Sequence, residues 1–148
     1  MKIEAANTDA WNIAKGKHSE KPTVLRFRPS LEAHLGDEKY PRRLLIVWQF
    51  DPEDNSGMPS ESQSADMKDF EDMLIQALDH DRLAILAFVF TTLGSREWHF
   101  YFSDISEAGI RINQALAATP GLPITLKVED DPNWDELRQV LQLCKPQS

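Results

Sequence analysis

Twelve residues decide the fold: Thr91-Thr92-Leu93-Gly94-Ser95-Arg96-Glu97-Trp98-His99-Phe100-Tyr101-Phe102. The Leu93-Gly94-Ser95 segment predicts a tight turn between two extended runs. Before the turn, Leu83–Thr91 is almost wholly apolar and predicts a buried strand. After it, Arg96–Asp104 alternates and predicts an antiparallel partner. A β-hairpin is therefore the starting point from which the rest of the chain can be interpreted.

The segments on either side of this hairpin predict further strands and helices. Leu44–Phe50 is almost wholly apolar, as expected for a strand in the middle of a sheet that is covered on both faces. Between about Glu61 and His80 apolar residues recur at helical spacing, and Ser60 with Gln63 predicts a capped helix start. The same periodicities predict strands at 11–14, 23–28 and 124–128, and helices at 106–118 and 134–143.

From residue 44 onward the expected order is strand, helix, strand, strand, helix, strand. This order predicts an α+β fold of the ferredoxin-like, or split βαβ, type, with an antiparallel sheet and two helices on one face. We expect a single domain over 1–148 with these parts: 1–10 disordered, an N-terminal β-hairpin at 11–28, the ferredoxin-like core at 44–129 and a C-terminal helix at 134–143. The other sheet face is either open or partly covered by the hairpin and the last helix.

Length and composition are those of an ordinary globular domain. The 148 residues are 41% hydrophobic and 27% charged, which allows a full core without disulfides. No apolar run approaches the roughly 20 residues that cross a membrane, and no apolar signal core follows Met1. The single cysteine, Cys144, lies in an apolar C-terminal run, which favours packing over reactivity. We therefore expect a cytoplasmic protein that makes no membrane contact.

The net charge of −8 is concentrated in one segment. Residues 51–81 contain ten acids and one base, whereas 1–50 carry a net +3 and 82–148 a net −2. Nucleic-acid binding requires clustered Lys and Arg, so we expect no nucleic-acid partner. An acidic helix face is either simply solvated or a contact surface for a basic protein partner. The carboxylates expected to form this acidic partner surface are Asp66, Asp69 and Asp72.

Strand periodicity collects titratable side chains on the second sheet face. The alternation directs these apolar side chains inward: Trp98, Phe100, Phe102, Ile124, Leu126 and Val128. The intervening residues are expected to be more exposed, and His99 becomes a candidate base oriented by Glu97 or Tyr101. An ordinary solvated sheet face explains the same pattern. The full candidate surface for a ligand or partner is Arg96, Glu97, His99, Tyr101, Lys127, Glu129, Asp130, Asp131 and Trp134.

The turn and the end of the last strand also suggest a charge pair. Arg96 lies beside the turn, and three carboxylates follow one another at 129–131. A guanidinium and a carboxylate are natural bidentate partners, so we expect an ion pair between them.

Motifs that would identify a reaction are missing. The sequence has neither of the standard glycine-rich phosphate loops and no Gly-x-Ser-x-Gly elbow. The four histidines form no helical pair for zinc. The loop after Asp51 departs from a calcium loop because Ser56 and Ser62 stand where glycine and glutamate are needed. We expect no cofactor and no metal, and the catalytic residues, if any, stay unknown.

Several features together resemble the uncharacterised family catalogued as domain of unknown function 695. They are Trp11, Gly57-Met58-Pro59-Ser60, Phe70-Glu71-Asp72, Thr91 through Trp98, Tyr101, Asp130-Asp131-Pro132 and Trp134. The resemblance runs from about Trp11 to Leu143 and implies no particular activity. Some members of the family look joined to a domain similar to the regulator of ribonuclease activity B, an acidic protein that binds an enzyme.

Two hypotheses of function follow from these observations. The first is a non-enzymatic interaction or regulatory domain that meets a basic partner through the acidic helix at 61–80 and the loop at 51–60. The alternative is a small enzyme or small-molecule-binding protein with a site around Arg96, Glu97, His99 and Tyr101. The first predicts no deep pocket near His99, and the second predicts one. Both a monomer and a homodimer are compatible with the sequence.

Overall fold

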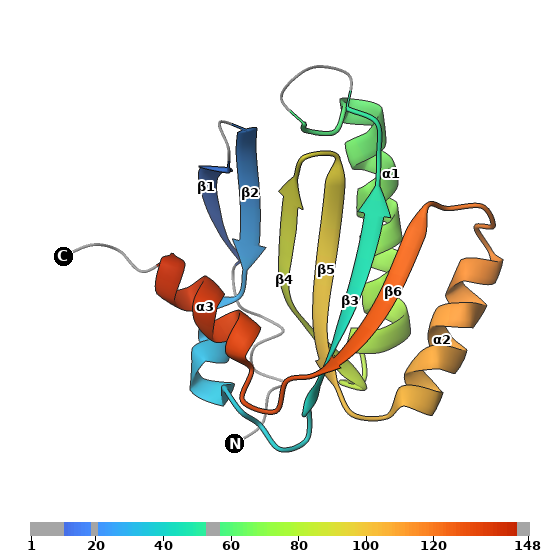
Figure 1. The fold of residues 1–148 in the computed structure, drawn as a ribbon. Coiled ribbons are helices and arrows are strands. Elements are labelled where there is room, and N and C mark those ends of the chain that lie inside the picture. Colours follow the sequence, from blue (N-terminus) through green and yellow to red (C-terminus); the bar gives the residue numbers. More distant parts are fainter. Residues whose placement is uncertain (1–10, 19–20, 53–56, 145–148) are drawn as a thin grey trace.

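The computed structural model describes residues 11–18, 21–52 and 57–144 as a mixed α/β fold (Figure 1). Residues 1–10, expected to be disordered, lie outside the described residues. The strands are β1 (Asn12–His18), β2 (Lys21–Phe27), β3 (Arg42–Gln49), β4 (Ala84–Thr92), β5 (Ser95–Phe102) and β6 (Ile124–Asp130). The helices are α1 (Glu61–Leu74), α2 (Ile105–Ala117) and α3 (Asp135–Leu143), with a 3₁₀ helix η2 (Pro29–His34) and a π-helical turn η3 (Ile75–Asp79).

The six strands form one open antiparallel sheet in the order β1-β2-β4-β5-β3-β6. The expected hairpin joins β4 to β5 through Leu93 and Gly94, whose φ angles of 50° and 79° suit a two-residue hairpin loop. The N-terminal hairpin extends the sheet, because β2 pairs with β4. The sheet therefore has β1 at one edge and β6 at the other.

Helices α1 and α2 cover one face of the sheet, as expected (Figure 1). The core beneath them contains Trp98, Phe100 and Phe102 of β5. Helix α1 begins at the expected residue: Ser60 Oγ accepts from the Gln63 backbone N–H, and the Gln63 side chain accepts from the Ser60 N–H. The helix predicted to continue to His80 changes at Ile75 into the π-helical turn.

The second face of the sheet is also covered, by α3 and η2 (Figure 1). Trp134, which precedes α3, stacks on Tyr101 with ring centroids 4.3 Å apart. Both rings are fully buried. The prediction that His99 and Tyr101 are more exposed was therefore wrong: their exposed fractions are 5% and 0%. The alternation of β5 was predicted correctly, but a second layer of helix buries the face that was taken to be polar surface.

In the edge strand β6, side chains that were expected to be buried are exposed instead. Leu126 lies opposite Ile46 of β3 and thus on the side of α1 and α2. Leu126 and Val128 are nevertheless each 43% exposed. Their side chains point as predicted but are not buried, because the sheet ends at this strand. None of the described helices is both long and apolar enough to span a membrane.

Candidate functional site

A chain of polar side chains crosses the second sheet face beside α3. Arg43 of β3 donates from Nη1 to His99 Nδ1 over 2.9 Å, and His99 Nε2 lies 2.9 Å from Glu97 Oε1. Arg43 also donates from Nη2 to Glu129 Oε2 over 2.6 Å, and its Nε lies 3.4 Å from Asp131 Oδ2. Arg43 is thus the hub that connects β3, β5 and the end of β6.

The partners of His99 fix its protonation state. A guanidinium only donates, so Nδ1 must accept, and the ring proton is on Nε2, from which it is donated to Glu97. Burial lowers the pKa of His99 below its ordinary value, against the opposing effect of the hydrogen bond to Glu97. Phe88 stacks on the ring at 4.1 Å. Both ring nitrogens are engaged, so in this arrangement His99 offers no free lone pair to act as a base.

Asp131 joins the same network to the start of α3. Its carboxylate accepts from Tyr101 Oη at 2.8 Å and from the backbone N–H of Asp135 at 2.7 Å. Tyr101 Oη in turn accepts from the Leu137 N–H at 3.2 Å. Burial and the neighbouring Asp131 raise the pKa of Tyr101, so the phenol stays protonated. The Asp-Asp-Pro-x-Trp segment therefore fastens α3 to the sheet, because the Asp131 carboxylate binds both Tyr101 and the first backbone N–H of the helix.

The other predicted residues of this surface do not converge on one site. Lys127 and Glu129 form an ion pair of 2.8 Å on the exposed side of β6. The pKa of Glu129 is lowered mainly by its hydrogen bond to Lys127 and also by the charge of Arg43. Asp130 lies 3.6 Å from Arg42 and is exposed. Tyr101, Asp131 and Trp134, by contrast, are buried. The predicted set thus divides into a buried structural network and a solvated strand edge.

Arg96 lies on the opposite face of the sheet from Glu97 and His99. Its Nε donates to Thr91 Oγ1 at 2.8 Å, and burial, followed by the charge of nearby Arg26, lowers its pKa. On the intervening strand β3, Arg96 lies opposite Trp48 and Glu129 lies opposite Arg43. Trp48 and Arg43 are five residues apart along β3. Five residues of strand span about 17 Å. The predicted ion pair between Arg96 and the carboxylates at 129–131 was therefore wrong, and Arg43 takes that position.

The acidic segment at 51–81 is partly neutralised by ion pairs, most of them with bases outside the segment. Its ion pairs are Glu71 with Arg26, Asp79 with Arg28 and Arg82, Asp81 with Arg111, and Asp72 with Lys68. Arg111 lowers the pKa of Asp81 to about 2. Within the described residues of the segment, the acids that form no ion pair are Asp51, Glu61, Asp66 and Asp69. Among the described residues of the segment, the unpaired negative charge thus lies at Asp51 and on α1 between Glu61 and Asp69.

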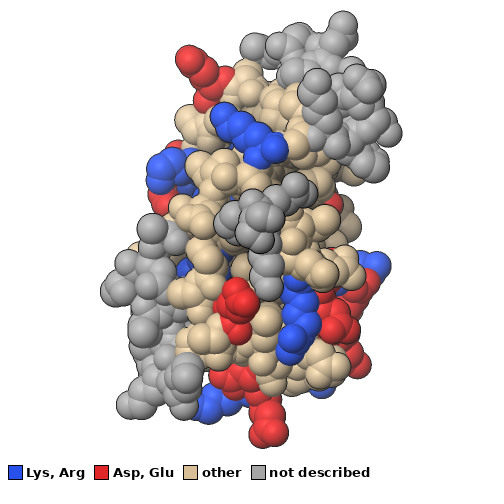
Figure 2. All heavy atoms as spheres, turned by 90° about the vertical axis from the view of Figure 1, so that its left-hand side faces the viewer, with Lys and Arg blue, Asp and Glu red and all other residues tan. Residues whose placement is uncertain are grey.

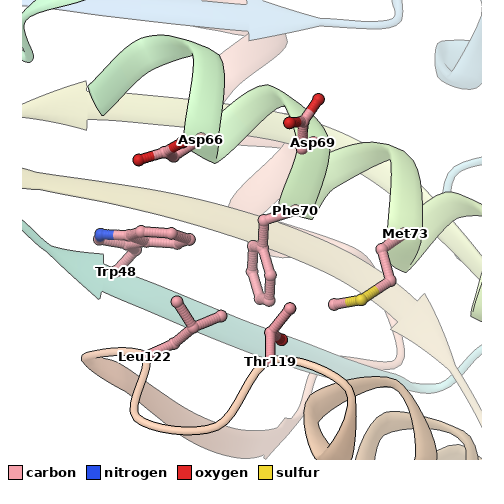
Figure 3. Close-up of a pocket in the computed structure, with 7 residues that line it drawn as sticks. All are labelled: Trp48, Asp66, Asp69, Phe70, Met73, Thr119 and Leu122. Atoms are coloured by element: carbon pink, nitrogen blue, oxygen red, sulfur yellow. The ribbon is translucent and has the colours of Figure 1, made fainter. Parts of the chain in front are cut away.

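Asp66 and Asp69 border a cavity of about 280 Å³ between α1 and the loop that joins α2 to β6 (Figure 3). We call it the α1 pocket. Its lining consists of Trp48, Asp66, Asp69, Phe70, Met73, Thr119 and Leu122. Residues 66, 69, 70 and 73 share one helical stripe, so the sequence of α1 places both acids beside the aromatic floor. The Trp48 and Phe70 rings meet edge to face with centroids 5.3 Å apart.

Figure 3 shows how the two carboxylates differ. The Asp66 carboxylate lies on the Trp48 side of the pocket, whereas the Asp69 carboxylate points outward from the helix. Met73 and Leu122 supply further apolar wall. The α1 pocket thus combines a hydrophobic interior with negative charge at its rim, an arrangement that favours a cation carried on an apolar stem.

Figure 2 shows the side of the molecule that lies on the left in Figure 1, and its charged side chains are not all of one sign. Over its described part, acidic and basic side chains are interspersed. A groove between η2 and α3, lined by Glu32, Leu35, Arg138, Leu141 and Gln142, likewise contains both signs of charge. Unlike the rim of the α1 pocket, this mixture of charges does not favour a cationic ligand over an anionic one.

Several residues of the two sites could not be recognised from the sequence. Arg43 stands at the start of an apolar strand, and its charge was the one available signal that something polar faces it. Trp48 and Leu122 line the pocket from separate elements, and no spacing in the sequence links them. Within the described residues no three His, Cys, Asp or Glu side chains are grouped to hold a metal ion.

Comparison with known protein families identifies a family for this chain. The model of a family of unknown function, DUF695, matches residues 9–142. No curated protein and no solved structure matches the chain.

Proposed function

The chain belongs to the DUF695 family of unknown function, so its role has to be argued from its own surface, and we propose that it is a non-enzymatic interaction module. The module binds a basic segment of a partner protein at the α1 pocket and regulates that partner by occupying the segment. One observation carries the proposal: Asp66 and Asp69 border an apolar cavity and form no ion pair with any described residue.

The dimensions of the pocket support a side chain as its occupant. At about 280 Å³ it is just below the range of small-molecule sites, roughly 300–1,000 Å³. An Arg or Lys side chain places its methylene stem against Phe70 and Met73 and keeps its charge near the carboxylates. Trp48 adds an aromatic ring, which attracts a guanidinium or ammonium group. We infer that the partner presents an Arg or Lys next to an apolar residue.

The alternative function, an enzyme or small-molecule binder at the polar sheet face, has less support. His99 is buried, and each of its ring nitrogens already has a protein partner. Tyr101 Oη likewise donates to Asp131 and accepts from Leu137. These groups make the hydrogen bonds that buried polar atoms require, and that role explains their presence without a substrate.

We further propose that the fold is a ferredoxin-like core extended at both ends. The element order β3-α1-β4-β5-α2-β6 and the strand order β4-β5-β3-β6 support this assignment. The hairpin of β1 and β2 is the N-terminal addition, and α3 is the C-terminal one. We also propose that the protein acts in the cytoplasm, and the unpaired carboxylates Asp66 and Asp69 support a regulatory role there.

Selection from a library of random peptides tests the binding proposal. We expect the enriched peptides to contain Arg or Lys beside an apolar residue. The double variant Asp66→Asn/Asp69→Asn should lose this enrichment, and Thr119→Arg, which introduces a cation at the pocket, should lose it too. Asp72→Asn is the matched control, because Asp72 lies on the same helix but pairs with Lys68 and does not line the pocket.

The selection experiment distinguishes a wrong function from a wrong binding site. Enrichment of peptides without a cation, or no enrichment at all, would contradict the proposed function. Enrichment that survives both the double variant and Thr119→Arg would place the binding site elsewhere. Circular dichroism and thermal unfolding of each variant establish that its fold is retained.

A further inference from the structure

We propose that a second copy of this chain pairs with the free edge of β6 and packs its α2 against the first copy's α2. Among the described strands β6 has a neighbour on one side alone: β3 pairs with its residues 124–130, and the sheet ends there. An edge strand presents unpaired backbone N–H and C=O groups, which another extended strand can complete. This interface uses neither Asp66 nor Asp69 and is independent of the proposed function.

Both β6 and α2 expose large apolar side chains. Leu126 and Val128 of β6 are each 43% exposed, and Ile105 and Ile110 of α2 are 51% and 52% exposed. Natural edge strands normally carry charges or proline that discourage pairing, and β6 does carry Lys127 and Glu129, which pair with each other on the other face of the sheet. On the α2 side its alternating positions are apolar at Ile124, Leu126 and Val128 and end at Asp130.

Charge favours a second copy over a foreign partner. The charged residues of α2 are Glu107 and Arg111, which pair with each other, and Arg111 also pairs with Asp81. The remaining exposed positions of the helix are uncharged: Ile105, Ser106, Ile110, Asn113, Gln114 and Ala117. Two chains of net charge −8 repel each other, so they meet most readily through a face without net charge. A basic or acidic partner would find no unpaired complementary charge on this helix.

Gly109 supports close approach of a second helix. Glycine inside a helix is destabilising, and here a Cβ atom would meet nothing within 4 Å. The fold of one copy therefore gives no steric reason for this glycine. Arg111 faces η3, where it donates to the Ala77 carbonyl, and Gly109 and Asn113 lie on the other flank of the helix. In Figure 1 α2 lies to the right of β6 and α1 to its left, so the flank turned away from η3 is the one that faces away from α1.

The sequence of β6 selects the register. A two-fold axis at Leu126 places it opposite the partner's Leu126 and places Ile124 opposite the partner's Val128. Thr125 then lies opposite the partner's Lys127. Moving the axis to Lys127 would bring two like charges face to face, which is unfavourable. We therefore infer an antiparallel pair centred on Leu126.

Sedimentation velocity over a range of protein concentrations tests the assembly. We expect the unmodified chain to form a dimer and Leu126→Lys to be a monomer. Ile13→Lys is the matched control, because Ile13 is an exposed apolar residue on β1, at the other edge of the sheet. It should leave the dimer intact. A monomer at every concentration, or a dimer that Ile13→Lys dissociates and Leu126→Lys does not, would overturn the proposal.

Cysteine cross-linking tests the register. In a Cys144→Ser background, Leu126→Cys should form a disulfide-linked dimer under mild oxidation, because directly opposed Cβ atoms lie about 4.5–5.5 Å apart. Val128→Cys should not, because the two copies of residue 128 would then be four positions, about 13 Å, apart along the strands. Cross-linking through residue 128 and not through residue 126 would refute the pairing centred on Leu126.

Discussion

Arg43 Nη1 donates a hydrogen bond to His99 Nδ1 over 2.9 Å, with both side chains buried between the sheet and α3. The contact holds the imidazole neutral, because a protonated ring would direct an N–H at the guanidinium. It explains why a strand face rich in titratable groups is compatible with a core. The histidine is part of the packing that attaches α3.

The stability of the protein should fall as the pH is lowered through about 6.5, the ordinary pKa of histidine. The unfolded chain takes up a proton on His99 near that value, whereas the folded chain does so only at lower pH, because burial lowers the pKa. Urea denaturation between about pH 7.5 and pH 5.5 measures the effect. His99→Asn should flatten this dependence, and His80→Asn, an exposed control, should not. Equal slopes for the parent and His99→Asn would show that the ring is not held neutral.

Removing the Tyr101 hydroxyl should destabilise the protein by about 1–3 kcal/mol. Tyr101→Phe leaves the buried Asp131 carboxylate without one donor and the Leu137 N–H without its acceptor. The free energy of unfolding from urea titration reports the change. A loss below about 0.5 kcal/mol would mean that water replaces the hydroxyl and that the fastening of α3 does not depend on it.

Two glycines with nearly the same backbone conformation should tolerate alanine differently. Gly94 and Gly121 have φ angles of 79° and 85°. Alanine at either position adopts an unfavourable left-handed conformation at a cost of about 1–2 kcal/mol. At Gly94 the added Cβ would also lie 3.0 Å from the Phe50 carbonyl oxygen, whereas at Gly121 it meets nothing within 4 Å. Gly94→Ala should therefore lower the melting temperature more than Gly121→Ala does, and equal effects would contradict the close contact.

Association of a selected basic peptide should depend strongly on salt. Exposed carboxylates attract a cationic partner over distances that salt screens, with a Debye length of about 8 Å at physiological ionic strength. We expect the association rate constant, measured by stopped flow, to fall roughly tenfold from low to physiological salt. The Asp66→Asn/Asp69→Asn variant should show a much weaker salt dependence. If the salt dependence of the double variant is unchanged, other acids such as Asp51 or Glu61 attract the peptide.

Local sequence signals predicted most of the fold. The apolar run at 44–50, the Ser60–Gln63 capping box, the Leu93-Gly94 turn and the alternation of Trp98 with Phe100 each act over a few residues. Such features determine where strands and helices begin and end, whatever packs against them. The predicted elements therefore agree with the structure to within a few residues at most ends.

The sequence could not show which helix packs against which face of the sheet. Leu137, Val140 and Leu141 indicate that α3 buries one side, but nothing in their spacing says that this side covers Tyr101. His99 looked like a surface residue because its partner Arg43 is 56 positions away. The α1 pocket was missed for the same reason, since α1, β3 and the loop at 119–122 meet only in three dimensions. Helical periodicity did predict the exposure of Asp66 and Asp69, which border the pocket, and of Asp72, which does not line it.

The methyl resonance of Met73 offers the most direct test of binding at the α1 pocket. Met73 lines the pocket, whereas Met58 and Met67 do not. In protein labelled with carbon-13 at the methionine methyl groups, we titrate a short peptide with one arginine between two leucines, and the same peptide with uncharged citrulline in place of arginine. The account predicts a saturable shift of the Met73 signal with the arginine peptide and little shift with the citrulline peptide. A Met73 signal that stays in place, or that responds equally to both peptides, would contradict it.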